Sequence, residues 1–367
     1  MKNSRIRQRI LLVVMAVLII VIVGSIVMTG HKKSSAPKIG LIITGSRTDA
    51  GWNGVHYQGV SYACDKLDAK LIVKENVPEN SELCAEAIRE LVDDGAGMII
   101  LSSYAYPEMV KDVIESYPEV AFYGSSAEYY TDNMTSYFGR MYQARYLAGI
   151  IAGMTTENNK IGYVAAMPNI EVNRGINAFT LGVRSVNPSA VVNVVWTGSW
   201  DNEEAETEAT SRLINDKDID LVTYHQNRHY VAQTADAAGI YSIGYNEAED
   251  NLSEKYLTAA VWNWEALYYG IVREYVLGEG NDVKRHWFGI NTGVVDLSEY
   301  SPAISGDVIK AVESAKSDIL AGKDVFSGVI YDNRGLLRCD EGESISDEQL
   351  LEKLDWFVDG VEIYERE

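Results

Sequence analysis

Short apolar runs rich in β-branched residues alternate with segments of helical periodicity from residue 38 onward. This alternation is the pattern of βαβ units, which build parallel sheets covered by helices on both faces. The expected strands lie at 38–44, 70–74, 97–101, 120–124, 160–165, 191–196, 220–224 and 241–245, with helices between them and one more at 263–277. These units are too many for one sheet of ordinary size, and the series breaks near 136–142. The sequence therefore predicts an α/β protein with two doubly wound parallel-sheet lobes.

An uncharged apolar stretch precedes this series at residues 10–28. As a helix, its 19 residues would span a hydrocarbon core of about 30 Å. Arg5, Arg7 and Arg9 precede it, so the positive-inside rule places that end in the cytoplasm. The stretch is longer than the apolar part of a signal peptide, and no Cys ends it as a lipid acceptor, although cleavage stays open. We expect a single-pass cell-membrane protein with a cytoplasmic end at 1–9, a transmembrane signal anchor at 10–29, a linker at 30–37 and the rest outside.

The charge of the chain restricts its partners. The sequence carries 32 Lys+Arg against 53 Asp+Glu, a net charge of −21. Six of the basic residues and none of the acidic ones precede residue 38, which leaves 26 basic against 53 acidic side chains and a net charge of −27. Because such an acidic surface repels phosphate groups, we expect neither nucleic acids nor polyphosphate nucleotides as partners.

Three cysteines, Cys64, Cys84 and Cys339, cannot all pair with one another. Cys64 and Cys84 fall on successive helices, which right-handed crossovers place on opposite faces of a doubly wound sheet. Buried free thiols are therefore expected.

The common catalytic and cofactor motifs are absent from the sequence: it has no GxGxxG, GxxxxGK[ST], HExxH, CxxC or GxSxG. His225 and His229 have the i,i+4 spacing of metal ligands, but no third ligand is evident. We therefore expect no catalytic residue, no metal and no cofactor, and nothing in the sequence requires an enzyme.

Aromatic, amide and hydroxyl residues follow the ends of the expected strands. Ligands of open α/β sheets bind beyond the carboxyl ends of the strands. An aromatic-walled slot with amides and hydroxyls suits a flat, neutral, hydrogen-bonding ring. The candidate binding residues are Trp52, Asn53, Tyr104, Ser126, Tyr142, Trp200, His225, Gln226, Asn246 and Trp264.

Four stretches carry a resemblance to a known family: 49–53 (DAGWN), 139–149 (GRMYQARYLAG), 200–201 (WD) and 355–360 (DWFVDG). Together they resemble the basic membrane lipoprotein family of ABC-transporter solute-binding proteins, which includes purine-nucleoside receptors and has the type I periplasmic-binding-protein fold. The resemblance covers about nine-tenths of the chain. The segments 224–227, 244–246 and 263–269 are most similar to the branch that binds purine bases or nucleosides.

The resemblance implies roles for the candidate residues. Trp52 would stack on one face of the ligand and Trp264 on the other, while Asn53 would bind an edge. Tyr104, Ser126 and Tyr142 would line the first lobe and the hinge, and Trp200, His225, Gln226 and Asn246 would come from the second lobe or its hinge. The first lobe would comprise 38–138 plus 246–286, and the second 139–245 plus 287–367 with the C-terminal tail. A multi-strand hinge at 138–140, 245–247 and 287–292 would join the lobes and let them close on the ligand.

The receptors for purine nucleosides place an acidic residue near position 246 to hold a ribose. This chain has Asn246 there, which leaves a free base or another heterocycle open as the ligand. The resemblance thus implies a monomeric, membrane-tethered protein that captures a purine base or a nucleoside for ABC permease subunits. Three alternatives stay open: a tethered sensor of the same fold, a protein that binds a sugar or other polar solute, and a nucleoside hydrolase-like enzyme.

Overall fold

The computed structural model describes residues 36–49, 51–279 and 283–365. The expected cytoplasmic end and transmembrane anchor, and most of the linker, lie outside these residues. The described residues from Lys38 onward form one compact unit. Within the described ranges, no helix is both long enough and apolar enough to cross a membrane.

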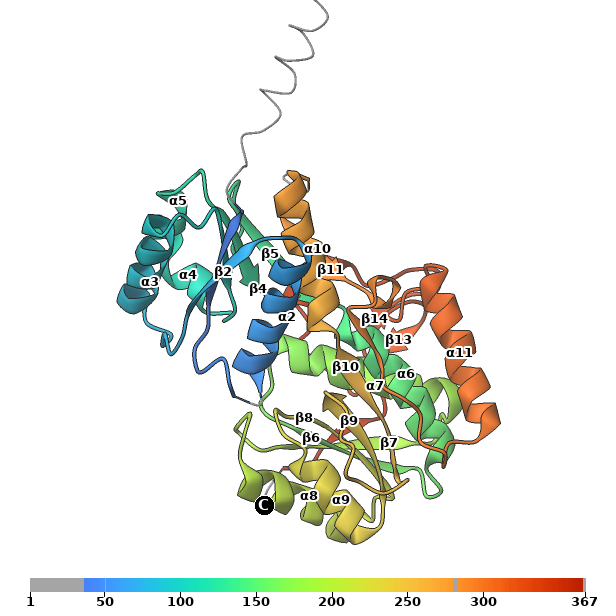
Figure 1. The fold of residues 1–367 in the computed structure, drawn as a ribbon. Coiled ribbons are helices and arrows are strands. Elements are labelled where there is room, and N and C mark those ends of the chain that lie inside the picture. The colour runs from blue at the N-terminus through green and yellow to red at the C-terminus, as the bar shows by residue number, and fades with distance from the viewer. Residues whose placement is uncertain (1–35, 50, 280–282, 366–367) are drawn as a thin grey trace, which may run out of the picture. The chain divides into compact units, whose positions relative to one another are not determined.

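The first lobe is built on a six-stranded sheet in the order β11-β5-β4-β3-β1-β2, with every pairing parallel. Its helices cover both faces, and Figure 1 shows α2 and α10 side by side. The strands are β1 (Lys38–Ile42), β2 (Lys70–Lys74), β3 (Met98–Leu101), β4 (Ala121–Ser125), β5 (Met134–Gly139) and β11 (Arg285–Phe288). The helices are α2 (Trp52–Lys66), α3 (Ser81–Asp93), α4 (Tyr106–Met109), α5 (Lys111–Glu115) and α10 (Trp264–Leu277).

The second lobe is built on a seven-stranded sheet in the order β12-β10-β9-β8-β6-β7-β15, in which only β12 is antiparallel. The strands are β6 (Lys160–Ala165), β7 (Val191–Trp196), β8 (Leu221–His225), β9 (Tyr241–Asn246), β10 (Tyr256–Trp262), β12 (Val295–Leu297) and β15 (Val361–Ile363). The helices are α6 (Met141–Thr155), α7 (Ile170–Val186), α8 (Glu203–Lys217), α9 (Tyr230–Ala238), α11 (Gly306–Leu320) and a 3₁₀ turn, η1 (Ile290–Thr292). The C-terminal segment adds the hairpin β13 (Ile330–Tyr331) and β14 (Leu337–Cys339) and the short helix α12 (Asp347–Glu352).

The chain passes between the two sheets three times: after β5 at Arg140, after β10 at Asn263 and after β11 at Gly289. The first and third crossings fall inside the expected segments 138–140 and 287–292. The second does not, because β10 pairs with β9 and β12 in the second sheet instead of joining the first lobe. Residues 247–262 therefore belong to the second lobe, and β11 takes Arg285–Phe288 into the first. A strand's own sequence gives its local conformation but not its sheet, since that choice depends on distant edges.

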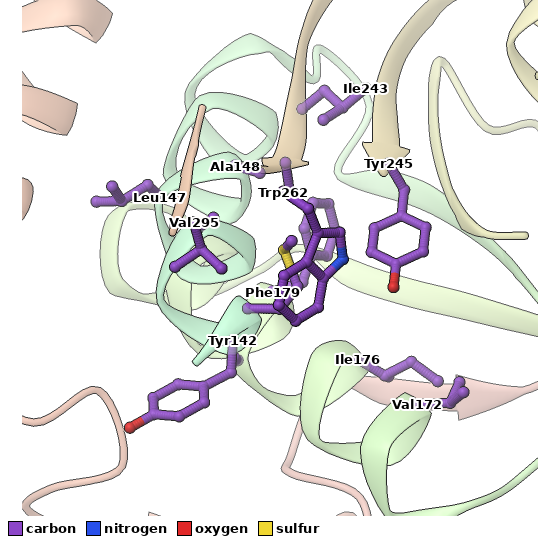
Figure 2. Packing of buried hydrophobic residues seen from close by; sticks show 14 of the residues in the cluster. Tyr142, Leu147, Ala148, Val172, Ile176, Phe179, Ile243, Tyr245, Trp262 and Val295 are labelled. Carbon is purple, nitrogen blue, oxygen red and sulfur yellow. The ribbon is translucent and has the colours of Figure 1, made fainter. Parts of the chain in front are cut away.

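Helices α6 and α7 of the second lobe pack closely on each other. A Cβ at Gly149 would lie 2.0 Å from the carbonyl oxygen of Phe179, and one at Gly182 would lie 2.0 Å from that of Tyr146. The two backbones can approach this closely only because both positions lack a side chain. Figure 2 shows part of the core around them, with Trp262 at the end of β10 among side chains of α6 and α7.

Helix α8 follows Asp201 and Asn202, two residue types that commonly cap a helix N-terminus. Asn202 is the N-cap: its side chain accepts from the backbone N–H of Ala205, and the Glu206 carboxylate accepts from the N–H of Asn202 at 3.1 Å. Asp201 instead pairs with Arg228 at 3.2 Å. Glu206 is fully buried, and this burial raises its pKa to about 7.

All three cysteines are free and buried, as expected.

Candidate functional site

A cavity of about 510 Å³ lies between the two lobes, where the carboxyl ends of their parallel strands meet. Its size is that of an ordinary small-molecule site. The first lobe contributes residues that follow β2, β3 and β4 and residues of the neighbouring strands β5 and β11. The second lobe contributes residues that follow β6 and β7, and α12 closes one side. The lining residues are Glu79, Tyr104, Ser126, Ala127, Glu128, Ser136, Phe138, Asn169, Ile170, Glu171, Arg174, Trp200, Arg285, His286, Trp287, Leu351 and Glu352.

Tyr104, Phe138, Trp200 and Trp287 supply aromatic walls from both lobes. Trp287 is the most firmly held of them. Its indole N–H donates to the carbonyl oxygen of Gly139 at 3.0 Å, and the Arg140 guanidinium lies 4.2 Å from its ring centroid. A ring fixed in this way loses little conformational entropy when a ligand binds.

Charged side chains of the cavity wall are mostly paired with protein groups. Arg285 lies 3.2 Å from Glu352, the Tyr104 hydroxyl donates to Glu128 at 3.2 Å, and the Ser103 hydroxyl donates to Glu79 at 2.5 Å. Fully ionised, the lining carboxylates outnumber the guanidiniums, so the site disfavours anions. The charged lining residues are Glu79, Glu128, Glu171, Glu352, Arg174 and Arg285.

The second-lobe wall carries a group of ionisable residues around the start of α7. Burial raises the pKa of Glu171, and the positive charges of Arg174 and Arg145 oppose that effect. Burial, together with the same two guanidiniums, holds the pKa of His225 well below its usual range. The imidazole is therefore neutral at physiological pH.

Three of the ten candidate residues line the cavity, namely Tyr104, Ser126 and Trp200. The other seven lie elsewhere, and the reason differs from one to the next.

Trp52 and Trp264 do not face each other across a gap. Their rings meet edge to face with centroids 5.4 Å apart, whereas a ring stacked between two walls needs about 7 Å between them. Trp264 is 6% exposed and stacks on Trp262 at 4.7 Å and on Tyr268 at 6.2 Å. In this conformation the pair belongs to the packing between α2 and α10.

Asn53 shapes the loop between β1 and α2. Its side-chain oxygen accepts from the Thr44 hydroxyl and from the Gly45 N–H, both at 3.0 Å, and its amide donates to Asp49 at 2.7 Å. With these contacts made, the side chain holds a turn and does not reach the cavity.

Tyr142, at the start of α6 (Figure 2), is buried against a cavity wall without lining the cavity itself. Its ring centroid lies 5.4 Å from that of Trp287, and its hydroxyl accepts from Arg140 at 2.9 Å. Tyr142 thus supports the Trp287 wall from behind.

His225, Gln226 and Asn246 belong to the second lobe and do not line the cavity. The His225 ring packs on Tyr245 with centroids 4.2 Å apart, and the Gln226 amide donates to the Thr197 hydroxyl at 2.8 Å. Asn246 ends β9 in a left-handed conformation, with φ of 73°.

Sequence reasoning missed several lining residues. Glu171 follows the same strand end as Asn169, so the strand-end rule could have included it. Trp287 lies inside the expected third crossover, where a hinge residue was anticipated but not a wall. Nothing local indicates Leu351 and Glu352, because α12 reaches the cavity from the C-terminal segment.

The comparisons with known proteins agree with this architecture. Residues 36–324 match the family model described as "ABC transporter substrate-binding protein PnrA-like". A solved transcriptional activator of the comK gene from Bacillus halodurans has a TM-score of 0.71 at 24% identity, covering 78% of this chain and 99% of that one. An ABC transporter solute-binding protein from Conexibacter woesei has a TM-score of 0.65 at 18% identity, covering 78% and 97%. These two likenesses show the fold, two α/β lobes of the type I periplasmic-binding-protein kind.

Two relatives in sequence carry names that describe ligands. A protein of Haloferax volcanii named as an ABC transporter glucose-binding protein, TsgA13, is 35% identical over 86% of this chain and 77% of its own length. A purine-binding protein of Brucella abortus is 30% identical over 89% of this chain and 93% of its own length. The chain therefore belongs to the Bmp family, the PnrA-like substrate-binding proteins of ABC transporters.

Proposed function

We propose that this ABC transporter substrate-binding protein captures a purine base or nucleoside, outside the cell membrane, and delivers it to permease subunits. The observation that carries the proposal is the cavity between the lobes, whose aromatic walls Tyr104, Phe138, Trp200 and Trp287 suit a flat heterocycle. Stacking on such rings contributes about 1–3 kcal/mol per base. The purine-binding relative is consistent with this ligand class.

The charge of the site supports a neutral ligand. Carboxylates outnumber guanidiniums in the wall, and Arg285 is already paired with Glu352. A phosphorylated nucleotide would bring its negative charge into this acidic setting, where Arg174 is the one guanidinium of the described lining that forms no ion pair with a carboxylate.

A sugar is the second candidate, because the relative with 35% identity is named as glucose-binding. Sugars also lie flat on aromatic rings, and their hydroxyl groups donate to carboxylates.

Thermal melts of the purified full chain, with purine bases, nucleosides, glucose and nucleotides added separately, test this proposal. At a hundredfold excess over the dissociation constant, a ligand adds about 2.7 kcal/mol to the free energy of unfolding, a rise of several degrees in Tm. A rise with bases or nucleosides, and none with their phosphates, is expected. A rise with glucose alone would favour the sugar, and a flat result throughout would reject both.

Membrane tethering is a separate part of the proposal, supported by Arg5, Arg7 and Arg9 ahead of the apolar stretch at 10–28. The chain should stay in the membrane fraction after a carbonate wash, with its N-terminus intact. A mature start near residue 30 would show cleavage instead.

A further inference from the structure

One carboxylate of the cavity wall is left without a hydrogen-bond donor. Glu79, Glu128 and Glu352 all have protein partners. Glu171 lines the cavity from the first turn of α7 with 30% of its side chain exposed, and no residue of the described ranges donates a hydrogen bond to it.

The nearest basic groups do not fill this role. The Nε2 atom of His225 lies 4.0 Å from the Glu171 carboxylate, beyond hydrogen-bond distance, and the imidazole is neutral. Arg174 donates to the carbonyl oxygen of Leu350 and Arg145 to that of Tyr224, both at 2.8 Å. Among the described residues, neither guanidinium forms an ion pair with Glu171, so their charges act on it only through space.

Interaction with the helix dipole does not by itself explain why Glu171 lines the cavity. A negative side chain in the first turn stabilises a helix, but an exposed position serves that purpose. Glu265, in the first turn of α10, has such an exposed position. The Glu171 carboxylate instead lines the cavity and is partly shielded from water. A hydrogen bond from a ligand donor to such a carboxylate is stronger than one to a fully solvated carboxylate.

We infer that Glu171 selects the ligand, accepting hydrogen bonds from two adjacent donors of a neutral molecule. This inference rests on the proposed function and deepens it. Two chemical sources supply such a pair: the ring N–H beside the amino group of an aminopurine such as guanine, and the vicinal hydroxyls of a ribose or a hexose. Adenine lacks two adjacent donors, because donors and acceptors alternate along its edges. Asn246, near which the resembling receptors place their acid, does not line this cavity.

Calorimetric titration of the full chain with four ligands tests the inference. Guanosine carries adjacent donors on both its base and its ribose, and 2′,3′-dideoxyguanosine carries them on the base alone. Adenosine and glucose carry adjacent donors only as hydroxyl groups. The Glu171→Gln variant removes the charge without changing the shape of the side chain. The Glu171→Asp variant keeps the negative charge near Arg174 but shortens the side chain by one methylene group. If the fold needs only this charge, the Asp variant folds like the wild type. Glu265→Gln removes a first-turn carboxylate outside the cavity and is the matched control.

Both Glu171 variants should raise the Kd of the ligands bound by the wild type about 10- to 100-fold, and Glu265→Gln less than about 3-fold. A loss that persists with dideoxyguanosine assigns the carboxylate to the base edge, and a loss confined to the other ligands assigns it to hydroxyls. Wild-type affinity in Glu171→Gln would overturn the inference and leave the proposed function standing. Absence of binding by the wild type would overturn the proposed function, and this inference with it.

Discussion

Replacing Trp264 by Ala should damage folding more than ligand binding. Its side chain is 6% exposed, and its ring centroid lies 4.3 Å from that of His56, 4.7 Å from Trp262, 5.4 Å from Trp52 and 6.2 Å from Tyr268. No described residue accepts a hydrogen bond from its indole N–H, so the loss is one of packing. A buried Trp replaced by Ala costs about 3–5 kcal/mol, which lowers Tm by about 6–20 °C in a domain of about 150–250 residues.

Trp200 is the counterpart in the same assay. It is half-buried and lines the cavity, and its ring contacts His225 with centroids 5.9 Å apart. Trp200→Ala should therefore change the free energy of unfolding by less than about 1 kcal/mol. It should weaken binding of a heterocyclic ligand about 5- to 150-fold, the equivalent of 1–3 kcal/mol of stacking.

Urea melts and calorimetric titrations of the two variants measure both quantities. A Trp264→Ala protein that melts like the wild type but no longer binds would return Trp264 to the ligand wall, and the packing argument would be wrong. If Trp264→Ala does not fold, Trp264→Phe keeps part of the contact, and binding by that variant decides the same question. Wild-type affinity in Trp200→Ala would remove this residue from the site.

Three further outcomes are expected. Gly149→Ala should lower the free energy of unfolding by about 1–3 kcal/mol in urea melts, because its Cβ would meet the Phe179 carbonyl. Gly270→Ala in α10, which has open space around it, should raise the free energy of unfolding by up to about 1 kcal/mol. Equal effects of the two substitutions would refute the close approach of α6 and α7. Since burial raises the pKa of Glu206 from 4.5 to about 7, the folded state binds the extra proton, so stability should fall as pH rises from about 4.5 to 7, and Glu206→Gln should flatten that slope in melts across this range. All three cysteines should resist a thiol reagent in the native protein and react after unfolding, and a thiol that reacts at once would contradict its burial.

Local pattern was sufficient for most of the secondary structure. The expected strands at 70–74, 160–165 and 191–196 coincide with β2, β6 and β7, because a β-branched run between helical segments specifies its own conformation. The helix expected between the strands at 97–101 and 120–124 is divided into α4 and α5. β5, β11 and β12 were not anticipated: they are short strands of three to six residues, at or near sheet edges, with little periodicity to detect.

The sequence by itself determined the alternating strands and helices, the two lobes and, through its ordered motifs, the family. Only the tertiary structure decided that β10 joins the second sheet, that Trp52 and Trp264 pack on each other, and that Trp287 and Glu171 reach the cavity. The physical reason is range. Backbone conformation follows from neighbours within a few residues, whereas a side chain at a strand end can turn into the core or into the cleft. Contacts between residues far apart in the chain, such as Arg174 with Leu350, settle that choice.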